Sequence, residues 1–251
     1  MDNRKPFIAG NWKMFKTGSE AIKTAEELVK LVADVTDTEV MIAPPFTALS
    51  AVSDVVKETN VSLGAQNFFW ENEGAYTGEI SSAMLLSAGC KYVIIGHSER
   101  RQFFGETDET VNKKIKTAIS SKLLPIFCIG ESEKERISKD TFSILDKQVS
   151  KGLKGLFSDE LQHLVIAYEP VWAIGTGKTA TREQAQEVHL FLRSLIEKKF
   201  GNLLAKSLRI LYGGSVKPDN IAELMAMPDV DGALVGGASL NAETFGKIVH
   251  F

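Results

Sequence analysis

Short apolar runs recur along the chain, and a longer segment with apolar residues at helical spacing follows most of them. The runs predict β-strands, and the spaced segments predict amphipathic helices. In one such segment Ala21, Ala25, Leu28 and Val32 lie on a single helical face. The predicted strands are 7–11, 39–43, 61–65, 92–95, 124–129, 164–168, 209–212 and 232–235. The predicted helices include 18–32, 81–88, 107–121, 182–200 and 218–225.

Strands that alternate with helices indicate a repeated β–α design, because parallel strands need crossover connections and helices supply them. Eight such units in a chain of 251 residues without linker-like stretches predict a single domain, 1–251. We expect an α/β fold, a (β/α)₈ barrel of eight parallel strands with outer helices. The alternative is an open doubly wound sheet, which usually has fewer strands. It often carries a Gly-x-Gly-x-x-Gly turn after its first strand, and this chain lacks that turn.

Composition narrows the classes of ligand and location. The net charge is −3 and the isoelectric point is about 5.9, so no global field attracts nucleic acid or an anionic membrane. No apolar run approaches the roughly 18 residues of a membrane helix, and the N-terminal segment does not resemble a secretory signal. Cys90 and Cys128 lack metal-ligand spacing and read as reduced core thiols. We therefore expect a cytoplasmic protein with no nucleic-acid or membrane partner.

Polar residues at the carboxyl ends of the strands are the candidates for chemistry, since active sites of such barrels lie there. The first strand continues as Asn11-Trp12-Lys13. Side chains two positions apart in an extended segment face the same way, so Asn11 and Lys13 can point into one site. The ammonium group would offset a phosphate dianion, and the amide would donate to a substrate oxygen. A solvated surface pair is the alternative.

His97 follows the fourth predicted strand and precedes a predicted helix, with Ser98 as its possible cap. The positive end of a helix disfavours the imidazolium form, so a neutral His97 that donates a hydrogen bond is favoured. A histidine bonded into the local turn is the alternative. Glu99 either pairs with Lys13 and orients it, or lies in the first helical turn in solvent.

Glu169 comes directly after the sixth predicted strand. A carboxylate in that position is costly to bury unless it is used or paired, and the following proline keeps it out of helical geometry. A loop glutamate in water is the alternative. The next residues predict a closing lid, because their middle is apolar and their glycines give backbone freedom; a loop packed permanently on the barrel rim is the other possibility. The lid residues are Pro170, Val171, Trp172, Ala173, Ile174, Gly175, Thr176, Gly177, Lys178, Thr179 and Ala180.

Glycine pairs follow the last two predicted strands, in Gly213-Gly214-Ser215 and in Gly236-Gly237. Paired glycines let backbone amides approach an oxyanion, and a short helix beginning at the second pair adds a favourable dipole. Barrels of this architecture often hold phosphate at these two loops. The pattern therefore predicts a phosphate site.

Taken together these motifs resemble the triosephosphate isomerase family. They occur in the family's order and span nearly the whole chain. The motifs are NWKM at 11–14, IGHSERR at 95–101, AYEPVWAIGTGK at 167–178, YGGSV at 212–216 and VGGAS at 235–239.

The resemblance implies an isomerase of glycolysis and gluconeogenesis that interconverts dihydroxyacetone phosphate and D-glyceraldehyde 3-phosphate through an enediolate. It implies Glu169 as the base, neutral His97 as the electrophile, and neither cofactor nor metal. Asn11 and Lys13 would bind substrate oxygen and charge. The implied phosphate cradle is Gly175, Ser215, Gly236 and Gly237.

The GAYTGE segment at 74–79 is similar to the projecting third loop of that family. The resemblance implies a homodimer in which Thr77 reaches towards Asn11 of the partner subunit. Ser98 and Glu99 would support the catalytic groups.

Other functions of the same fold need residues that this sequence does not place at the strand ends. An aldolase needs a Schiff-base lysine inside the barrel, and no predicted strand contains lysine; a metal-dependent epimerase needs clustered ligands, whereas the four histidines are scattered. A phosphate sensor or a surface adhesin on the same fold stays open, since fold alone does not exclude it. Glu169 argues against a sensor, which has no use for a base there.

Overall fold

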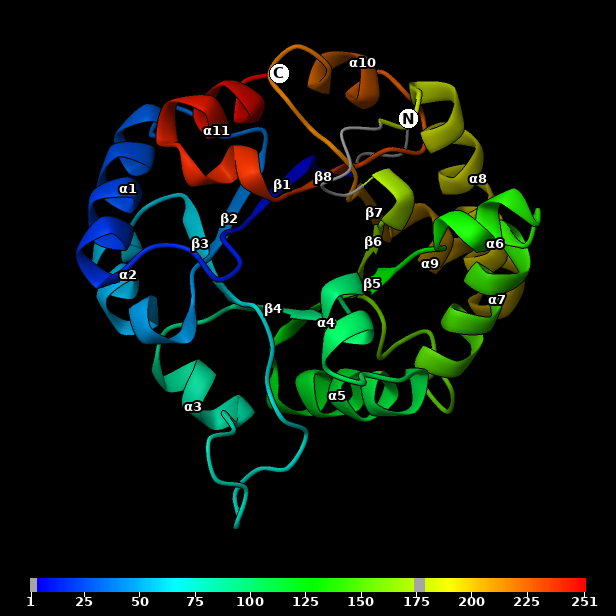
Figure 1. The fold of residues 1–251 in the computed structure, drawn as a ribbon, viewed down its shortest axis with the longest axis horizontal. Coiled ribbons are helices and arrows are strands. Elements are labelled where there is room, and N and C mark those ends of the chain that lie inside the picture. The colour runs from blue at the N-terminus through cyan, green and yellow to red at the C-terminus, as the bar shows by residue number, and fades with distance from the viewer. Residues whose placement is uncertain (1–3, 174–178) are drawn as a thin grey trace.

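The computed structural model describes residues 4–173 and 179–251. Eight parallel strands form a closed barrel in sequence order, and helices surround it (Figure 1). The first strand pairs with both the second and the eighth, which closes the sheet. The strands are β1 Phe7–Asn11, β2 Glu39–Ala43, β3 Val61–Ala65, β4 Tyr92–Ile95, β5 Leu124–Ile129, β6 Val165–Tyr168, β7 Arg209–Tyr212 and β8 Gly232–Val235. The predicted (β/α)₈ barrel, or TIM barrel, is confirmed.

The α-helices that the structure describes lie outside the strands (Figure 1). They are α1 Gly18–Leu31, α2 Leu49–Val56, α3 Ser82–Ser87, α4 Ser98–Phe103, α5 Asp108–Ser121, α6 Glu133–Ile137, α7 Thr141–Gly152, α8 Arg182–Phe200, α9 Asn202–Ser207, α10 Ile221–Met225 and α11 Ala242–Val249. Three short 3₁₀ helices are η1 Phe46–Ala48, η2 Val171–Ala173 and η3 Gly237–Leu240. Among the described residues, no helix is long and apolar enough to cross a membrane.

The predicted boundaries of α1, α3, α5 and β6 differ from the structure by one residue, and the predicted start of α10 differs by three. Strand β6 begins one residue later than predicted, because the N–H of Leu164 donates to the Leu161 carbonyl in a turn. Helix α10 begins at Ile221 rather than at 218. The Asn220 side chain accepts the N–H of Lys217 at 2.8 Å, so a side-chain turn competes with the helix there.

The barrel interior is a packed core rather than a channel. Phe7 and Tyr92 stack inside it with ring centroids 4.9 Å apart, and Met41 fills the space beside Gly64. A Cβ atom at Gly64 would lie 2.6 Å from the Met41 sulfur, so a larger residue there would require the flexible Met41 side chain to move. A second, larger core lies between the strands and the helices. Because side chains fill the interior, a ligand site has to lie at an end of the barrel.

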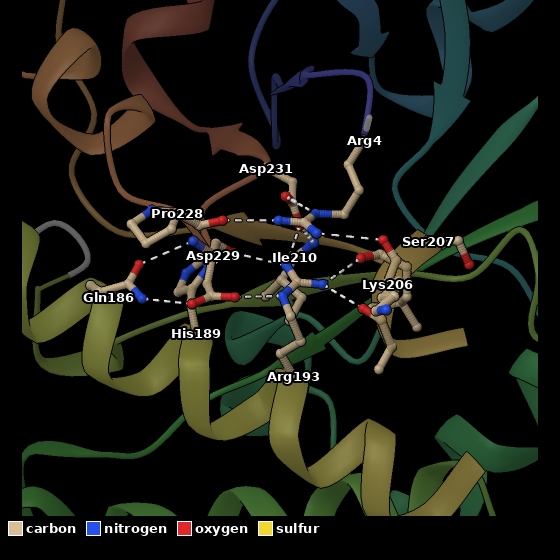
Figure 2. Close-up of polar contacts among 12 residues, drawn as sticks. Arg4, Gln186, His189, Arg193, Lys206, Ser207, Ile210, Pro228, Asp229 and Asp231 are labelled. Atoms are coloured by element: carbon tan, nitrogen blue, oxygen red, sulfur yellow. Dashed lines mark hydrogen bonds and ion pairs between the residues drawn. The ribbon is translucent and has the colours of Figure 1, made fainter. Parts of the chain in front are cut away.

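A cluster of paired charges lies at the amino end of the barrel (Figure 2). Asp231 directly precedes β8, and its carboxylate accepts hydrogen bonds from Arg4, Arg193 and the N–H of Ile210. The Arg193 Nε donates to Asp229 at 2.6 Å. This network joins α8 to β7, β8 and the segment before β1.

Candidate active site

A cavity of about 400 Å³ opens at the carboxyl ends of the strands. It brings together most of the site residues that were predicted from the ends of the strands. These residues lie at the carboxyl ends of five different strands. The predicted site residues that line it are Asn11, Lys13, His97, Glu169, Ala173, Ser215, Gly236 and Gly237. Ser98 and Glu99 lie in α4 beside it. Within 4–173 and 179–251, no group of three His, Cys, Asp or Glu side chains is placed to hold a metal ion.

The segment after β1 aims Lys13 through an unusual backbone conformation. Lys13 has a φ of 52°, in the left-handed region, and its N–H donates to Asn11 Oδ1 at 3.0 Å. The Gln66 side chain donates to the carbonyls of Lys13 and Ala43, each at 2.8 Å. The Lys13 ammonium pairs with Glu99, as the sequence suggested. Gln66 was not predicted as a site residue, because it acts on a segment 53 positions away.

His97 caps α4, so the prediction that Ser98 is the cap is wrong. The His97 backbone is extended, with φ −52° and ψ 139°, whereas Ser98 is already helical. His97 Nδ1 accepts the N–H of Glu99 at 3.2 Å, and Nε2 lies 2.9 Å from Glu169 Oε1. A nitrogen that accepts a hydrogen bond carries no proton, so the contacts fit a neutral ring protonated on Nε2.

Opposing influences act on the proton affinity of His97. Burial lowers its pKa, but the carboxylates of Glu169 and Glu99 outweigh burial and raise the pKa above its ordinary value. Protonation of Nδ1 would break the cap on the Glu99 N–H, which opposes the imidazolium form. The neutral ring is thus the form that satisfies every hydrogen bond at this position.

The Glu169 carboxylate is buried, with 1% of the residue exposed. Its Oε2 accepts the N–H of Ser98 at 2.9 Å, and the Ser98 hydroxyl lies 3.4 Å from Oε1. Burial raises the pKa of Glu169, but His97, the Ser98 amide and Lys13 outweigh burial and lower it. The carboxylate is therefore held as an anion by groups that favour its charge.

The backbone around Glu169 is packed so tightly that only glycine fits beside it. The Glu169 N–H donates to the Ile129 carbonyl at 2.7 Å. A Cβ atom at Gly130 would lie 1.7 Å from the Glu169 carbonyl oxygen, and one at Gly213 would lie 2.9 Å from Glu169 Cγ. Gly130 was not singled out from the sequence, since one glycine after a strand has no specific signal.

The start of the predicted lid is tied to a buried carboxylate that sequence reasoning missed. Glu131 is fully buried, and its Oε1 accepts hydrogen bonds from Tyr168, Trp172 and Arg136 at 2.9–3.0 Å. The Arg136 guanidinium also lies 4.7 Å from the centre of the Trp172 ring. Pro170, Val171, Trp172 and Ala173 are thus described, as are Thr179 and Ala180, whereas Ile174, Gly175, Thr176, Gly177 and Lys178 lie outside the described residues.

The far end of the cavity is formed by the two glycine-containing loops. Ser215, Gly236 and Gly237 line it, and η3 begins at Gly237 as the predicted short helix. A Cβ atom at Gly236 would lie 3.3 Å from Lys13 Cε, so the glycine lets this loop approach the lysine closely. Thr77 is exposed in the 74–79 segment and does not line this cavity.

A buried carboxylate, an imidazole and an ammonium group meet in one cavity at the carboxyl end of a parallel barrel. These features define a (β/α)₈-barrel protein equipped for acid–base chemistry on a small anionic substrate.

Comparison with known proteins agrees with that class. The model of the triosephosphate isomerase family matches residues 6–251. The triosephosphate isomerases of Geotalea uraniireducens and Geobacter metallireducens are 58% and 59% identical over 248 residues, which cover 99% of both chains in each pair. That of Thermoanaerobacter pseudethanolicus is 56% identical over 99% of this chain and 100% of its own. The chain belongs to the triosephosphate isomerase family and is an isomerase.

Proposed function

We propose that Glu169, His97, Lys13 and Asn11 carry out the reaction of this chain, the interconversion of dihydroxyacetone phosphate and D-glyceraldehyde 3-phosphate. That reaction follows from membership of the family and belongs to glycolysis and gluconeogenesis. The observation that supports the residue roles best is the buried Glu169 carboxylate within hydrogen-bond reach of His97, in the cavity that Lys13 also lines.

Glu169 would remove the proton next to the substrate carbonyl and return it to the neighbouring carbon. One carboxylate suffices because the two carbons are adjacent. The His97 Nε2–H and the Lys13 ammonium would stabilise the negative charge that develops on the enediolate oxygens. A positioned base contributes roughly 10²–10⁴ in rate, and each oxyanion donor contributes on the order of 10²–10³.

One of the hydrogen bonds that hold Glu169 at rest, the bond from His97, comes from a group that substrate can engage instead. His97 Nε2 contacts Glu169 in the structure, and a substrate oxygen would take that N–H instead. Release of this bond would also remove one of the influences that raise the pKa of His97. The ring would then act as a neutral donor, as the cap on the Glu99 N–H requires.

The substrate phosphate would bind at the far end of the cavity, at Ser215, Gly236 and Gly237, with Gly175 from the lid. The lid, Pro170–Ala180 in the sequence interpretation, would exclude water and so strengthen the interactions inside. It would also suppress loss of phosphate from the enediolate. The Glu131 contacts to Trp172 support a lid whose amino-terminal end is anchored.

A coupled assay tests the proposal directly. Glyceraldehyde 3-phosphate is supplied with a second enzyme that consumes NADH when dihydroxyacetone phosphate appears, and we expect turnover without added metal. Glu169→Gln keeps the shape of the side chain but removes its basicity, so it should abolish turnover and retain binding. Binding of substrate by the parent chain without turnover would favour a phosphate sensor.

We also propose that the chain forms a homodimer through the 74–79 segment. This segment, cyan in Figure 1 between β3 and α3, projects from the barrel. Large apolar side chains are exposed near the loops that follow β1, β3 and β4, and exposed apolar side chains that gather in one patch are typical of a protein–protein interface. They are Met14, Phe15, Tyr76, Phe103 and Phe104. Thr77 would reach towards Asn11 of the partner subunit.

Sedimentation equilibrium should give twice the 27.5 kDa mass of the chain, and Thr77→Arg should shift the protein to the monomer.

Two further features support the expected organisation and location. The pairing of β1 with β8 joins the two ends of the chain in one sheet, which supports a single domain over 1–251. Cys90 and Cys128 are buried and unpaired, which supports a reducing, cytoplasmic environment.

A further inference from the structure

The segment that follows β5 supports the segment that carries Glu169. The Glu169 N–H donates to the Ile129 carbonyl at 2.7 Å, and the Val171 N–H donates to the Glu131 carbonyl at 3.1 Å. Gly130 lies between these two acceptors in the chain, and a Cβ atom there would lie 1.7 Å from the Glu169 carbonyl oxygen. A shift of the Gly130 backbone would therefore move the backbone of the proposed base.

The Gly130 backbone is itself held by one side chain, that of Gln148 on helix α7. Gln148 Oε1 accepts the Gly130 N–H at 2.9 Å, and Gln148 Nε2 donates to the Gly130 carbonyl at 3.0 Å. A primary amide carries both a donor and an acceptor, so it can pair with both backbone groups of one residue, as a neighbouring strand does. Glycine has wide backbone freedom, and these two bonds restrain it at this position.

Helix α7 holds Gln148 in a fixed place relative to β5. Leu145 and Gly152, about one turn before and after Gln148, lie on the same helical face and are buried. A Cβ atom at Gly152 would lie 2.4 Å from Phe127 Cζ, so the helix packs directly against β5. The Asn112 side chain, from α5, donates to the Gly152 carbonyl at 2.8 Å. The amide of Gln148 is therefore presented to Gly130 from a rigid support.

We propose that Gln148 is a positioning residue for the reaction: through Gly130 it sets where the Glu169 carboxylate lies relative to the reacting carbons. This proposal rests on the proposed role of Glu169 as the base. Gln148 is not among the described residues that line the substrate cavity, so it acts through the backbone. The loops proposed to bind the phosphate follow β7 and β8, whereas Gly130 follows β5. Loss of the two bonds should therefore change the chemical step more than the binding of substrate.

Gln148→Met removes both hydrogen bonds and keeps an unbranched side chain of similar length. The kcat value should fall by roughly tenfold or more, since a misplacement of about 1 Å can cost about 10²-fold in rate. KM should stay within about twofold of that of the parent, the pattern expected when only the transition state loses an interaction. The coupled assay measures both constants, and circular dichroism gives the folded fraction.

Gln186→Met is the matched control. Gln186, on helix α8, also makes two hydrogen bonds with one residue: it accepts the N–H of Asp229 and donates to the Asp229 carboxylate (Figure 2). Both glutamines are half-buried, but Gln186 belongs to the network at the amino end of the barrel. Its substitution should lower stability and leave kcat within about twofold of that of the parent.

Gln148→Glu gives a signature that a loss of stability does not produce. The introduced carboxylate accepts the Gly130 N–H but repels the Gly130 carbonyl, so kcat should be low in alkaline solution. The protonated carboxyl group has a donor and an acceptor, like the amide it replaces. The ratio of the variant kcat to the parent kcat should therefore rise as pH falls from about 8 to about 5.5, because the carbonyl contact favours the protonated form.

A folded Gln148→Met variant that keeps the kcat of the parent would overturn the positioning role. A Gln148→Glu ratio that does not vary with pH would overturn it as well, and this test holds even if Gln148→Met does not fold. Turnover retained by Glu169→Gln would instead overturn the role of Glu169, and absence of turnover in the parent chain would overturn the proposed function.

Discussion

Buried charges gather at both ends of the barrel, and the two clusters are built differently. At the amino end, Arg193 donates from all three nitrogens, to the carboxylates of Asp229 and Asp231 and to the backbone (Figure 2). At the carboxyl end, Glu169 lies 2.9 Å from His97 Nε2 and accepts hydrogen bonds from the backbone N–H and the hydroxyl of Ser98. The partners at the amino end are all internal, whereas at the carboxyl end the His97 contact to Glu169 borders the cavity and a substrate can replace it.

The difference shows how one fold separates stability from reactivity. Every donor of Arg193 is matched inside the protein, so removal of Arg193 takes a charged partner from two buried carboxylates at once. Glu169 is held as an anion but by contacts that must exchange during a reaction. The division agrees with the general distinction between the structural and catalytic ends of such barrels. Substitutions at the two ends should therefore change different measurements.

The largest effect is expected from Arg193→Met. This change removes the guanidinium that pairs with both Asp229 and Asp231, and breaking a buried pair costs about 3–5 kcal/mol. Urea unfolding should show a loss of this size, whereas kcat of the folded fraction should change little. Arg182→Met, on the same helix α8 but in an exposed pair with Glu183, is the control and should leave the unfolding free energy nearly unchanged. Equal losses in both variants would contradict the structural role of the network.

Glu169→Asp should instead lower the activity and leave the stability of the protein nearly unchanged. The carboxylate retracts by one methylene from the position that reaches the substrate, so kcat should fall by about 10²–10³ while KM changes little. Thermal unfolding should stay close to that of the parent. A kcat near that of the parent would refute the assignment of Glu169 as the base.

The paired charges at the amino end of the barrel also predict that the stability of the protein depends on pH. Burial raises the pKa of Glu39, but hydrogen bonds from Lys91, Tyr92 and Arg209 outweigh it and lower the pKa from 4.5 to about 2. Because the folded pKa is the lower one, this stabilisation is complete above pH 4.5 and disappears as pH falls towards 2.

Glu39→Gln isolates this contribution from that of other carboxylates. The difference in unfolding free energy between parent and variant should shrink between pH 5 and pH 2, and guanidinium unfolding at several pH values measures it. A difference that does not vary over this range would show that Glu39 is not stabilised as an anion.

The smallest effect is expected from Glu99→Gln at the carboxyl end. Glu99 pairs with Lys13, but its side chain is 38% exposed, and exposed pairs contribute about 0–1 kcal/mol. The kcat/KM value should therefore fall less than about fivefold, mainly through KM. A loss as large as that of Glu169→Asp would mean that Glu99 acts on the substrate rather than on the position of Lys13.

Much of the site could be predicted from the sequence, because the local pattern of apolar residues shows where each strand ends. Asn11, His97 and Glu169 each follow an apolar run, and the parallel order of the strands brings these ends to one side. Gln66 and Glu131 carry no such signal. Each acts on a segment brought close by folding, such as the Glu131 contact with Trp172 across 41 positions.

The sequence by itself determined the alternation of strands and helices, the barrel and the residue types at its carboxyl end, because side-chain periodicity and parallel connections are local properties of the chain. The tertiary structure alone decided which groups hold those residues. It showed that His97 rather than Ser98 caps α4, and that Ser98 instead binds Glu169 from 71 positions away. Such hydrogen bonds depend on distances between segments, which local patterns do not encode.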